Sequence, residues 1–250
     1  MSGHSKWATI KHKKGAADAK RGKLFTKCIK EITVAARMGG GDLDGNPRLR
    51  KAVTEAKGSQ MPSDTITRAI KRGTGEIEGV NYEEIVYEGT GPGGTLFVIE
   101  AMTDNKNRTV AELRKVFERH NGTLAAGGTA MWAFDRKGMV QVAKDAVDEE
   151  KLMDLTMDAG AENVAAEGDE WQVLCAVSDI DAVSSAIDKA GIKVASSGPG
   201  YVPKNKKVLE GKDAEQVIAL FEALDDHDDS QNTYADFDIP ESEMVRIAAQ

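Results

Sequence analysis

The chain has 250 residues, a net charge of −8, 40% hydrophobic residues and two cysteines. Two cysteines argue against a disulfide framework or a zinc site, and no apolar run reaches the ~18 residues that cross a membrane. No apolar stretch follows the charges at the N-terminus, so we expect no secretory signal and a cytoplasmic location.

The charge is unevenly distributed. Residues 1–72 hold 17 Lys and Arg against 6 Asp and Glu, whereas residues 73–250 hold 16 against 35. A basic segment ahead of an acidic remainder predicts contact with a polyanion, most often nucleic acid.

Residues 1–22 form a predicted basic arm. Its lysines are suited to phosphates, while Trp7 and His4 are available to stack on a base. A solubilising tail is the alternative, but a tail has no need of Trp7, and the charges continue in phase onto a helix. The predicted nucleic-acid-binding residues are Lys6, Trp7, Lys11, Lys13, Lys14, Lys20, Arg21, Lys23, Lys27, Lys30 and Arg108.

Three helices are expected next, forming a bundle over residues 23–77. The first spans 20–38, with Leu24, Phe25 and Ile29 on an apolar side and lysines projecting from the opposite side. A second begins at the cap Asn46 and Pro47, and a third follows Pro62 and ends near Gly73. The third helix carries Arg68, Lys71 and Arg72 on one face near its C-terminus, where the helix dipole alone would account for them.

After residue 79 the periodicity becomes that of strands. Strands are expected at 82–88 and 95–102, followed by a helix at 107–120 and a strand at 130–134. Residues 138–198 then follow the order βαββαβ, which is the ferredoxin-like pattern. A strand at 205–209, a helix at 213–224 and a strand at 232–237 complete the chain, and these three elements cannot close a sheet alone.

We therefore expect the strands at 95–102 and 232–237 to share one sheet. The fold class is α+β multidomain: an N-terminal three-helix bundle plus two α/β domains, with a ferredoxin-like βαββαβ domain inserted in the middle domain. The predicted boundaries are 78–136 and 204–250 for the middle α/β domain and 137–203 for the inserted ferredoxin-like domain.

The motifs that would indicate nucleotide binding, calcium binding or catalysis do not occur in the structural context that these functions require. Gly89, Gly91 and Gly94 satisfy G-x-G-x-x-G, but the loop leads into a strand rather than a helix N-terminus, which indicates a hairpin. The acidic run 225–229 lacks the glycine and spacing of a calcium loop. No nucleophile is paired with a base in a recognisable way. We assign no catalytic residue, no cofactor and no metal, and predict that the protein is not an enzyme.

The polar segment 103–109 joins a strand to a helix. Asp104 or Asn105 can cap that helix. Lys106 and Arg108 gain nothing from the dipole at a helix N-terminus, so their presence indicates a surface that meets phosphate or another anion.

Ordered motifs along essentially the whole chain resemble the YebC/PmpR family. These motifs are Gly3-His-Ser-Lys-Trp7, Asp18-Ala-Lys-Arg-Gly-Lys23, Phe25-Thr-Lys27, Gly39-Gly-Gly-Asp42, Asn46-Pro-Arg-Leu-Arg50, Arg68-Ala-Ile-Lys-Arg-Gly73, Tyr87-Glu-Gly89, Gly91-Pro-Gly93, Thr103-Asp-Asn105 and Asn107-Arg-Thr109. The resemblance implies a helical N-terminal domain and two α/β domains, one ferredoxin-like and inserted in the other. Members are described as probable transcriptional regulatory proteins. They are also related to the mitochondrial translational activator of cytochrome c oxidase, which points to the ribosome.

We expect a non-enzymatic nucleic-acid-binding regulator of gene expression. The first interpretation is a ribosome- and RNA-associated translation factor that relieves stalled translation, a role that the family resemblance implies. A lysine-rich arm reads charge and shape, which suits structured RNA. The alternative is a DNA-binding transcriptional regulator acting at promoters, although no helix pair looks like a helix-turn-helix. A protein-interaction adaptor would need no basic arm. The expected partners are nucleic acid (rRNA, tRNA or DNA) and the ribosome, with no membrane, and the expected state is a monomer.

Overall fold

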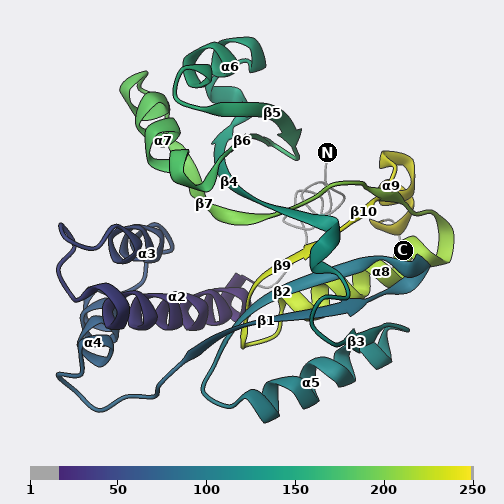
Figure 1. Ribbon diagram of the computed structural model, residues 1–250, viewed down its shortest axis with the longest axis horizontal. Coiled ribbons are helices and arrows are strands. Elements are labelled where there is room, and N and C mark those ends of the chain that lie inside the picture. The colour runs from purple at the N-terminus through teal and green to yellow at the C-terminus, as the bar shows by residue number, and fades with distance from the viewer. Residues whose placement is uncertain (1–16, 249–250) are drawn as a thin grey trace.

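The computed structural model describes residues 17–248 and shows a mixed α/β protein in which helices come first and sheets follow (Figure 1). The α-helices are α2 (Ala17–Gly39), α3 (Pro47–Gly58), α4 (Ser63–Thr74), α5 (Lys106–Arg119), α6 (Glu149–Met157), α7 (Ile180–Lys189), α8 (Gly211–Asp225) and α9 (Glu241–Ala248). The strands are β1 (Glu83–Thr90), β2 (Leu96–Thr103), β3 (Thr123–Ala125), β4 (Phe134–Ala143), β5 (Ala161–Glu167), β6 (Glu170–Cys175), β7 (Val194–Pro203), β8 (Lys207–Val208), β9 (Ser230–Ala235) and β10 (Phe237–Asp238). No helix within the described residues is long and apolar enough to span a bilayer.

Helices α2, α3 and α4 pack around one apolar core, as the periodicity predicts. The Asn46 side chain accepts the Leu49 N–H at 3.0 Å, and its amide donates to the carbonyls of Ala35 and Gly40, each at 2.8 Å. This buried side chain therefore caps α3 and also ties α3 to the end of α2. The core residues are Ile32, Ala35, Ala36, Leu49, Ala52, Val53, Ala56, Met61, Ile66 and Ala69.

The first sheet has the strand order β3-β1-β2-β9, and its neighbouring strands are antiparallel. Phe97 of β2 lies opposite Ala235 of β9, which confirms the expected pairing of two strands that are far apart in the sequence. Helices α5 and α8 cover one face, where the rings of Phe97 and Phe117 meet edge to face at 5.9 Å. β1 and β2 pair as a hairpin, as the glycine-rich loop predicts.

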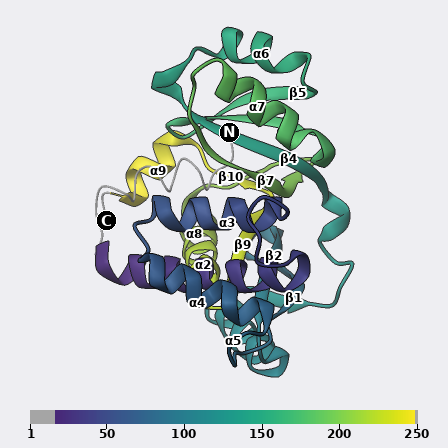
Figure 2. The same ribbon diagram turned by 90° about the vertical axis from the view of Figure 1, so that its left-hand side faces the viewer.

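The second sheet has the order β5-β6-β4-β7, again antiparallel, with α6 and α7 packed on it. Figure 2 shows this layer above the bundle and the first sheet. Its elements follow one another in the order β4-α6-β5-β6-α7-β7, the βαββαβ succession that the sequence predicts. Its core residues are Val140, Val142, Val147, Leu152, Val164, Val173, Cys175, Val183, Ile187 and Ile192.

The long strands β4 and β7 link the two sheets. They remain paired from Phe134 opposite Pro203 to Val142 opposite Val194. At the root of this ribbon, Tyr201 of β7 meets Tyr234 of β9 edge to face, with ring centroids 5.4 Å apart. The second sheet is therefore mounted on the face of the first sheet opposite α5 and α8.

Some local expectations are wrong. The segment expected as a strand at 130–134 is instead the 3-10 turn η2 (Met131–Ala133), and β4 begins only at Phe134. β3, β10 and α9 are not anticipated. Leu24, placed on the apolar side of the first helix, is 44% exposed, because the bundle core begins further along α2.

Candidate nucleic-acid interface

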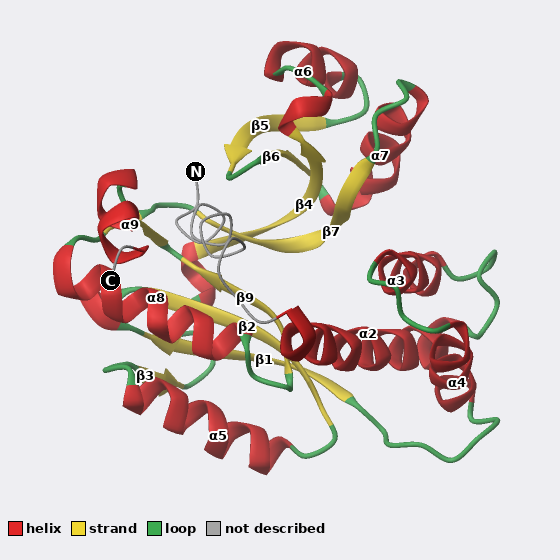
Figure 3. Cartoon of the chain, turned by 180° about the vertical axis from the view of Figure 1, so that it is seen from behind, coloured by secondary structure: helices red, strands yellow, loops and turns green. Residues whose placement is uncertain are grey.

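The basic side of α2 faces an acidic turn, residues 225–229, between α8 and β9. Figure 3 shows the beginning of α2 beside the first sheet. Lys23 Nζ donates to the Asp226 carbonyl at 2.9 Å and lies 3.5 Å from the carboxylate of the same residue. Lys27 Nζ donates to the Asp225 carbonyl, also at 2.9 Å. Two residues predicted to bind nucleic acid therefore hold the bundle against the sheet.

Lys30 is buried, and the expectation that it projects into solvent with the other lysines is wrong. Its Nζ lies 2.6 Å from Asp229 Oδ1 and donates to the carbonyls of Met102 and Asp228 at 3.1 and 2.8 Å. Only 5% of Lys30 is exposed. The physical reason is that Lys30 lies against the end of β2 and the last residues of the acidic turn, which cover its side chain, whereas the side chains of Lys23 and Lys27 are partly open.

Arg108 shares Asp229 with Lys30. Its Nη2 donates to Asp104 Oδ1 at 2.7 Å and to Asp229 Oδ2 at 3.1 Å, and these two carboxylates raise the pKa of the guanidinium. Asn105 caps α5 by accepting the Arg108 N–H at 3.1 Å. The charge of Arg108 is thus balanced within the protein, although 42% of its side chain is exposed. A phosphate would have to compete with both carboxylates, and contact with nucleic acid stays a prediction.

Asp229 is the centre of this network. Burial alone would raise the pKa of its carboxyl, but hydrogen bonds from Lys30, Thr109 and Arg108 outweigh burial and lower the pKa to about 2. Thr109 Oγ1 donates at 2.7 Å, so hydroxyl and cation donors surround the same carboxylate. Asp229 is therefore ionised at any physiological pH.

A cavity of about 390 Å³ opens beside these ion pairs, and Glu112, His227 and Asp229 place possible metal-ligand atoms within 4.8 Å of one another. The Asp229 carboxylate is already engaged by Lys30 and Arg108, and two cations at this distance repel a metal ion. His227 Nδ1 accepts the Asp229 N–H at 3.1 Å and its Nε2 lies 3.2 Å from Glu112 Oε2, so both ring nitrogens have partners. We assign no metal to this cavity.

The open cationic surface of the bundle lies on α4 instead. Arg68, Lys71 and Arg72 are exposed, and none of them forms an ion pair with another described residue. The spacing of these residues signals a shared face in the sequence, but the helix dipole offers a competing explanation there. The sequence does not show that the lysines of α2 bind the acidic turn at residues 225–229.

The predicted nucleic-acid-binding residues of the basic arm lie partly outside the described part of the chain. Lys6, Trp7, Lys11, Lys13 and Lys14 lie outside the described residues. Lys20 and Arg21 lie in the first turns of α2, and Arg21 is exposed. The contact of these residues with nucleic acid stays a prediction.

A helical N-terminal part rich in Lys and Arg, followed by two antiparallel sheets, defines a class of mixed α/β proteins. Two family models match this chain: "TACO1/YebC protein N-terminal domain" over residues 5–76 and "TACO1/YebC second and third domain" over residues 82–237. The chain therefore belongs to the TACO1/YebC family, which confirms the resemblance carried by its motifs.

Curated relatives share most of the sequence. A protein of Desulforapulum autotrophicum is 55% identical over 241 residues, which cover 96% of this chain and 98% of the relative. A protein of Geobacter sulfurreducens is 53% identical over 247 residues, covering 99% and 100%. Both are named probable transcriptional regulatory proteins. The crystal structure of a conserved hypothetical protein from Aquifex aeolicus is similar at a TM-score of 0.85 and 40% identity, over 90% of this chain and 93% of that one.

Proposed function

We propose that this protein is a cytoplasmic, non-enzymatic nucleic-acid-binding regulator of gene expression that acts as a ribosome- and RNA-associated translation factor and relieves stalled translation. The observation that carries nucleic-acid binding is the charge division of the chain, 17 cations against 6 acids in residues 1–72 and 16 against 35 in the rest. The translational role rests on the relation of the family to the mitochondrial translational activator. A cationic segment of this size supplies sequence-independent affinity for phosphates. The acidic remainder is repelled by a nucleic-acid backbone, so the chain approaches nucleic acid with the bundle first.

The structure narrows which cations are available. Lys23, Lys27 and Lys30 of α2 are engaged with the turn 225–229, whereas Arg68 and its neighbours on α4 are open to solvent. We propose that α4 and the basic arm supply the phosphate contacts together. A surface of exposed Lys and Arg on a compact bundle reads charge and shape, which suits structured RNA.

The alternative is a promoter-binding transcriptional regulator. It is supported by the names of the relatives and by one local feature: α3 ends at Gly58 and α4 begins at Ser63, so four residues join two helices, a spacing found in helix-turn-helix motifs. Against it, the basic residues of α4 lie in its second half, whereas the recognition helix of such a motif contacts bases through its N-terminal residues.

Co-sedimentation with ribosomes tests the proposal. The first variant replaces Arg68, Lys71 and Arg72 by Ala, and the second replaces Lys13, Lys14, Lys20 and Arg21 by Ala. A matched control replaces three exposed lysines of the second sheet layer, Lys151, Lys189 and Lys193. At moderate salt the wild type and the control should sediment with ribosomes, while both test variants should stay in the supernatant.

If both variants still co-sediment with ribosomes and the wild type protects a defined promoter sequence from nuclease, the transcriptional alternative replaces the translational one. Crosslinking in cells, followed by sequencing of the attached nucleic acid, then identifies the target.

We also propose that residues 137–203 are a ferredoxin-like domain inserted in the middle domain. Support comes from the pairing of β2 with β9, because the strands of the second sheet, β4 to β7, lie between these two strands in the sequence. Since Phe134 and Pro203 are directly paired, their Cα atoms are roughly 5 Å apart, and two glycines can replace residues 135–202. The shortened chain should keep a cooperative unfolding transition. Loss of all folded structure would show that the two sheets are one unit.

A further inference from the structure

Trp132 is an exposed aromatic side chain on a packed turn. It lies in η2, directly before β4, and 67% of it is exposed. Ala130 and Phe134 on either side of the turn are buried against Val98 of β2. The turn is thus anchored to the sheet while one large indole faces solvent, although burial of such a side chain would be strongly favourable.

A buried carboxylate fixes this turn. Glu88 of β1, only 6% exposed, accepts backbone N–H groups of Gly128, Ala130 and Met131, at 2.7 Å from Gly128 and 2.8 Å from Met131. The indole is itself oriented, because its Nε1 donates to the Thr129 carbonyl at 2.8 Å. A side chain held in place in this way loses little conformational entropy when it binds a partner.

One lysine contacts the Trp132 backbone and lies 3.5 Å from the Asp135 carboxylate, and two further lysines follow it in the acidic part of the chain. The segment 204–207 holds three lysines in four residues, all exposed. Lys204 Nζ donates to the Trp132 carbonyl at 2.9 Å, and the Lys204 N–H donates to the Ala133 carbonyl at 2.9 Å. Lys207 Nζ donates to the Gly94 carbonyl at 2.7 Å, and Lys206 lies 3.9 Å from Glu167.

We infer that Trp132 and the lysines of segment 204–207 form a second nucleic-acid contact, in which the indole stacks on an unpaired base and the lysines meet the adjoining phosphates. This inference rests on the proposed function and names the form of nucleic acid bound at a place far from α4. Stacking on an aromatic ring beside a cationic groove is the usual way to hold single strands, since every base has a π-face. Bases inside a duplex have no free face to offer.

The surroundings favour a base over an apolar protein partner. The neighbours that contact Trp132 through hydrogen bonds are Thr129 and Lys204, and the nearby apolar residues Ala130, Ala133 and Phe134 are buried. An apolar protein partner could therefore bury the indole but would place its own apolar surface against the charged Lys204. An anionic strand with flat bases matches both features.

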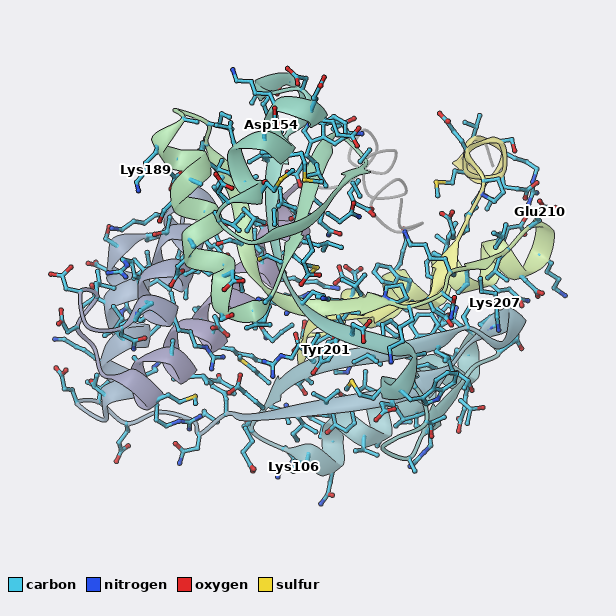
Figure 4. All side chains as sticks on the ribbon, turned by 45° about the horizontal axis from the view of Figure 1, so that its top comes forward. Lys106, Asp154, Lys189, Tyr201, Lys207 and Glu210 are labelled. Carbon is cyan, nitrogen blue, oxygen red and sulfur yellow. The ribbon has the colours of Figure 1, made fainter. Side chains whose placement is uncertain are left out.

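The contact lies apart from the bundle. In Figure 4 Lys207 is labelled at the end of the molecule opposite the helices α2 to α4, beyond Tyr201. A single short duplex stem on α4 would not reach it. The two contacts together suit a folded RNA that offers a structured region and an unpaired segment.

Fluorescence anisotropy with labelled oligonucleotides tests this contact on the full-length protein. Three probes are compared at one salt concentration: a single-stranded RNA of about 12 nucleotides, the same RNA as a duplex, and an abasic strand of equal length. The variants are Trp132→Ala, Trp132→Phe, and Lys204, Lys206 and Lys207 each replaced by Gln. Val208→Ala, at a position that is 62% exposed nearby, is the matched control.

Trp132→Ala should weaken binding of the single strand about tenfold, whereas Trp132→Phe should stay within about threefold of the wild type. Neither change should alter binding of the duplex or the abasic strand. The lysine variant should flatten the slope of log affinity against log salt by about two on the single strand. The thermal midpoint of Trp132→Ala should equal that of Val208→Ala, because both side chains are exposed.

The inference is overturned if Trp132→Ala binds the single strand like the wild type, or if it loses as much affinity for the abasic strand. It is also overturned if Trp132→Ala keeps its RNA affinity but loses a protein from nuclease-treated ribosomes. Wild-type protein that binds none of the three probes would instead overturn the proposed function, so the two failures can be told apart.

Discussion

Lys30 Nζ and Asp229 Oδ1 lie 2.6 Å apart, and 7% and 4% of their side chains are exposed. This ion pair joins the helical bundle to the first sheet between residues that are nearly 200 positions apart in the chain. Because both groups are out of water, the loss of either leaves a buried charge with fewer partners.

Replacing Lys30 by Met should lower the free energy of unfolding by about 3 kcal/mol, since a buried carboxylate is left with Arg108 as its remaining cation. Replacing Lys23 by Met should cost about 0–1 kcal/mol, because its side chain is 43% exposed. Urea unfolding followed by circular dichroism measures both. Equal losses for the two variants would show that burial does not distinguish these lysines.

Stability should depend on pH through Asp229. The folded protein lowers the pKa of this carboxyl from 3.8 to about 2. Its contribution to stability is therefore complete above the unfolded pKa and is lost as the pH falls from about 4 to about 2. Thermal midpoints measured across this range should fall less steeply for Asp229→Asn than for the wild type. Parallel curves for the two proteins would contradict the assignment.

Salt dependence should separate the two basic faces of the bundle. Replacing Arg68, Lys71 and Arg72 by Ala should flatten the slope of log affinity for duplex nucleic acid against log salt by about 2 to 3. Replacing Lys23 and Lys27 by Ala should change the slope by less than about 1, because these lysines are engaged with the acidic turn. Filter binding at several salt concentrations measures both slopes. The reverse ranking would mean that the acidic turn gives way to nucleic acid.

Gly73 should not tolerate a side chain. A Cβ there would collide with the Thr33 carbonyl oxygen and lie 2.6 Å from the Ala36 Cβ, where α4 packs against α2. Gly73→Ala should cost about 1–3 kcal/mol of stability through overpacking. Gly58→Ala is the matched control, since no atom lies within 4 Å of the added Cβ, and it should be neutral or stabilising. Denaturant midpoints decide between the two outcomes.

Glu88 should hold the turn before β4 in place. Backbone N–H donors, Gly128 foremost, lower the pKa of its carboxyl despite burial, which alone would raise it. Glu88→Ala leaves three backbone N–H groups, one buried and two partly buried, without their acceptor and should cost about 1–3 kcal/mol. Hydrogen exchange at Gly128 and Met131 should accelerate, while Glu118→Ala, an exposed change on α5, should leave it unaltered. Unchanged exchange in Glu88→Ala would show that packing alone fixes the turn.

Most elements could be predicted from the sequence because their signals are local. Asn46 and Pro47 mark the start of α3, and the alternating pattern around Val140 and Val173 marks the second sheet. The segment at 130–134 reads as a strand because Met131, Trp132 and Phe134 are apolar. Its conformation is instead decided by hydrogen bonds to Glu88, more than 40 positions earlier.

At the candidate interface, too, contacts between distant parts of the chain could not be predicted from the sequence. Local periodicity places Lys23, Lys27 and Lys30 together on α2, but it carries no information on what that side touches. The acidic turn is equally visible in the sequence, and only the packing of α2 on the sheet brings the two together. Sequence spacing therefore predicts the charge of a helix face, whereas tertiary contacts decide whether that face is free.

The position of β9 affects how the chain folds during synthesis. β9 is the outer strand beside β2, so β2 has an unpaired edge until the ribosome has made residues 230–235. The nascent protein must hold the apolar strand around Phe97 in this incomplete state while the whole second sheet is produced, and closure of such a long loop slows folding. A chain that ends prematurely before Ser230 therefore exposes an adhesive strand edge and is a substrate for chaperones or aggregation.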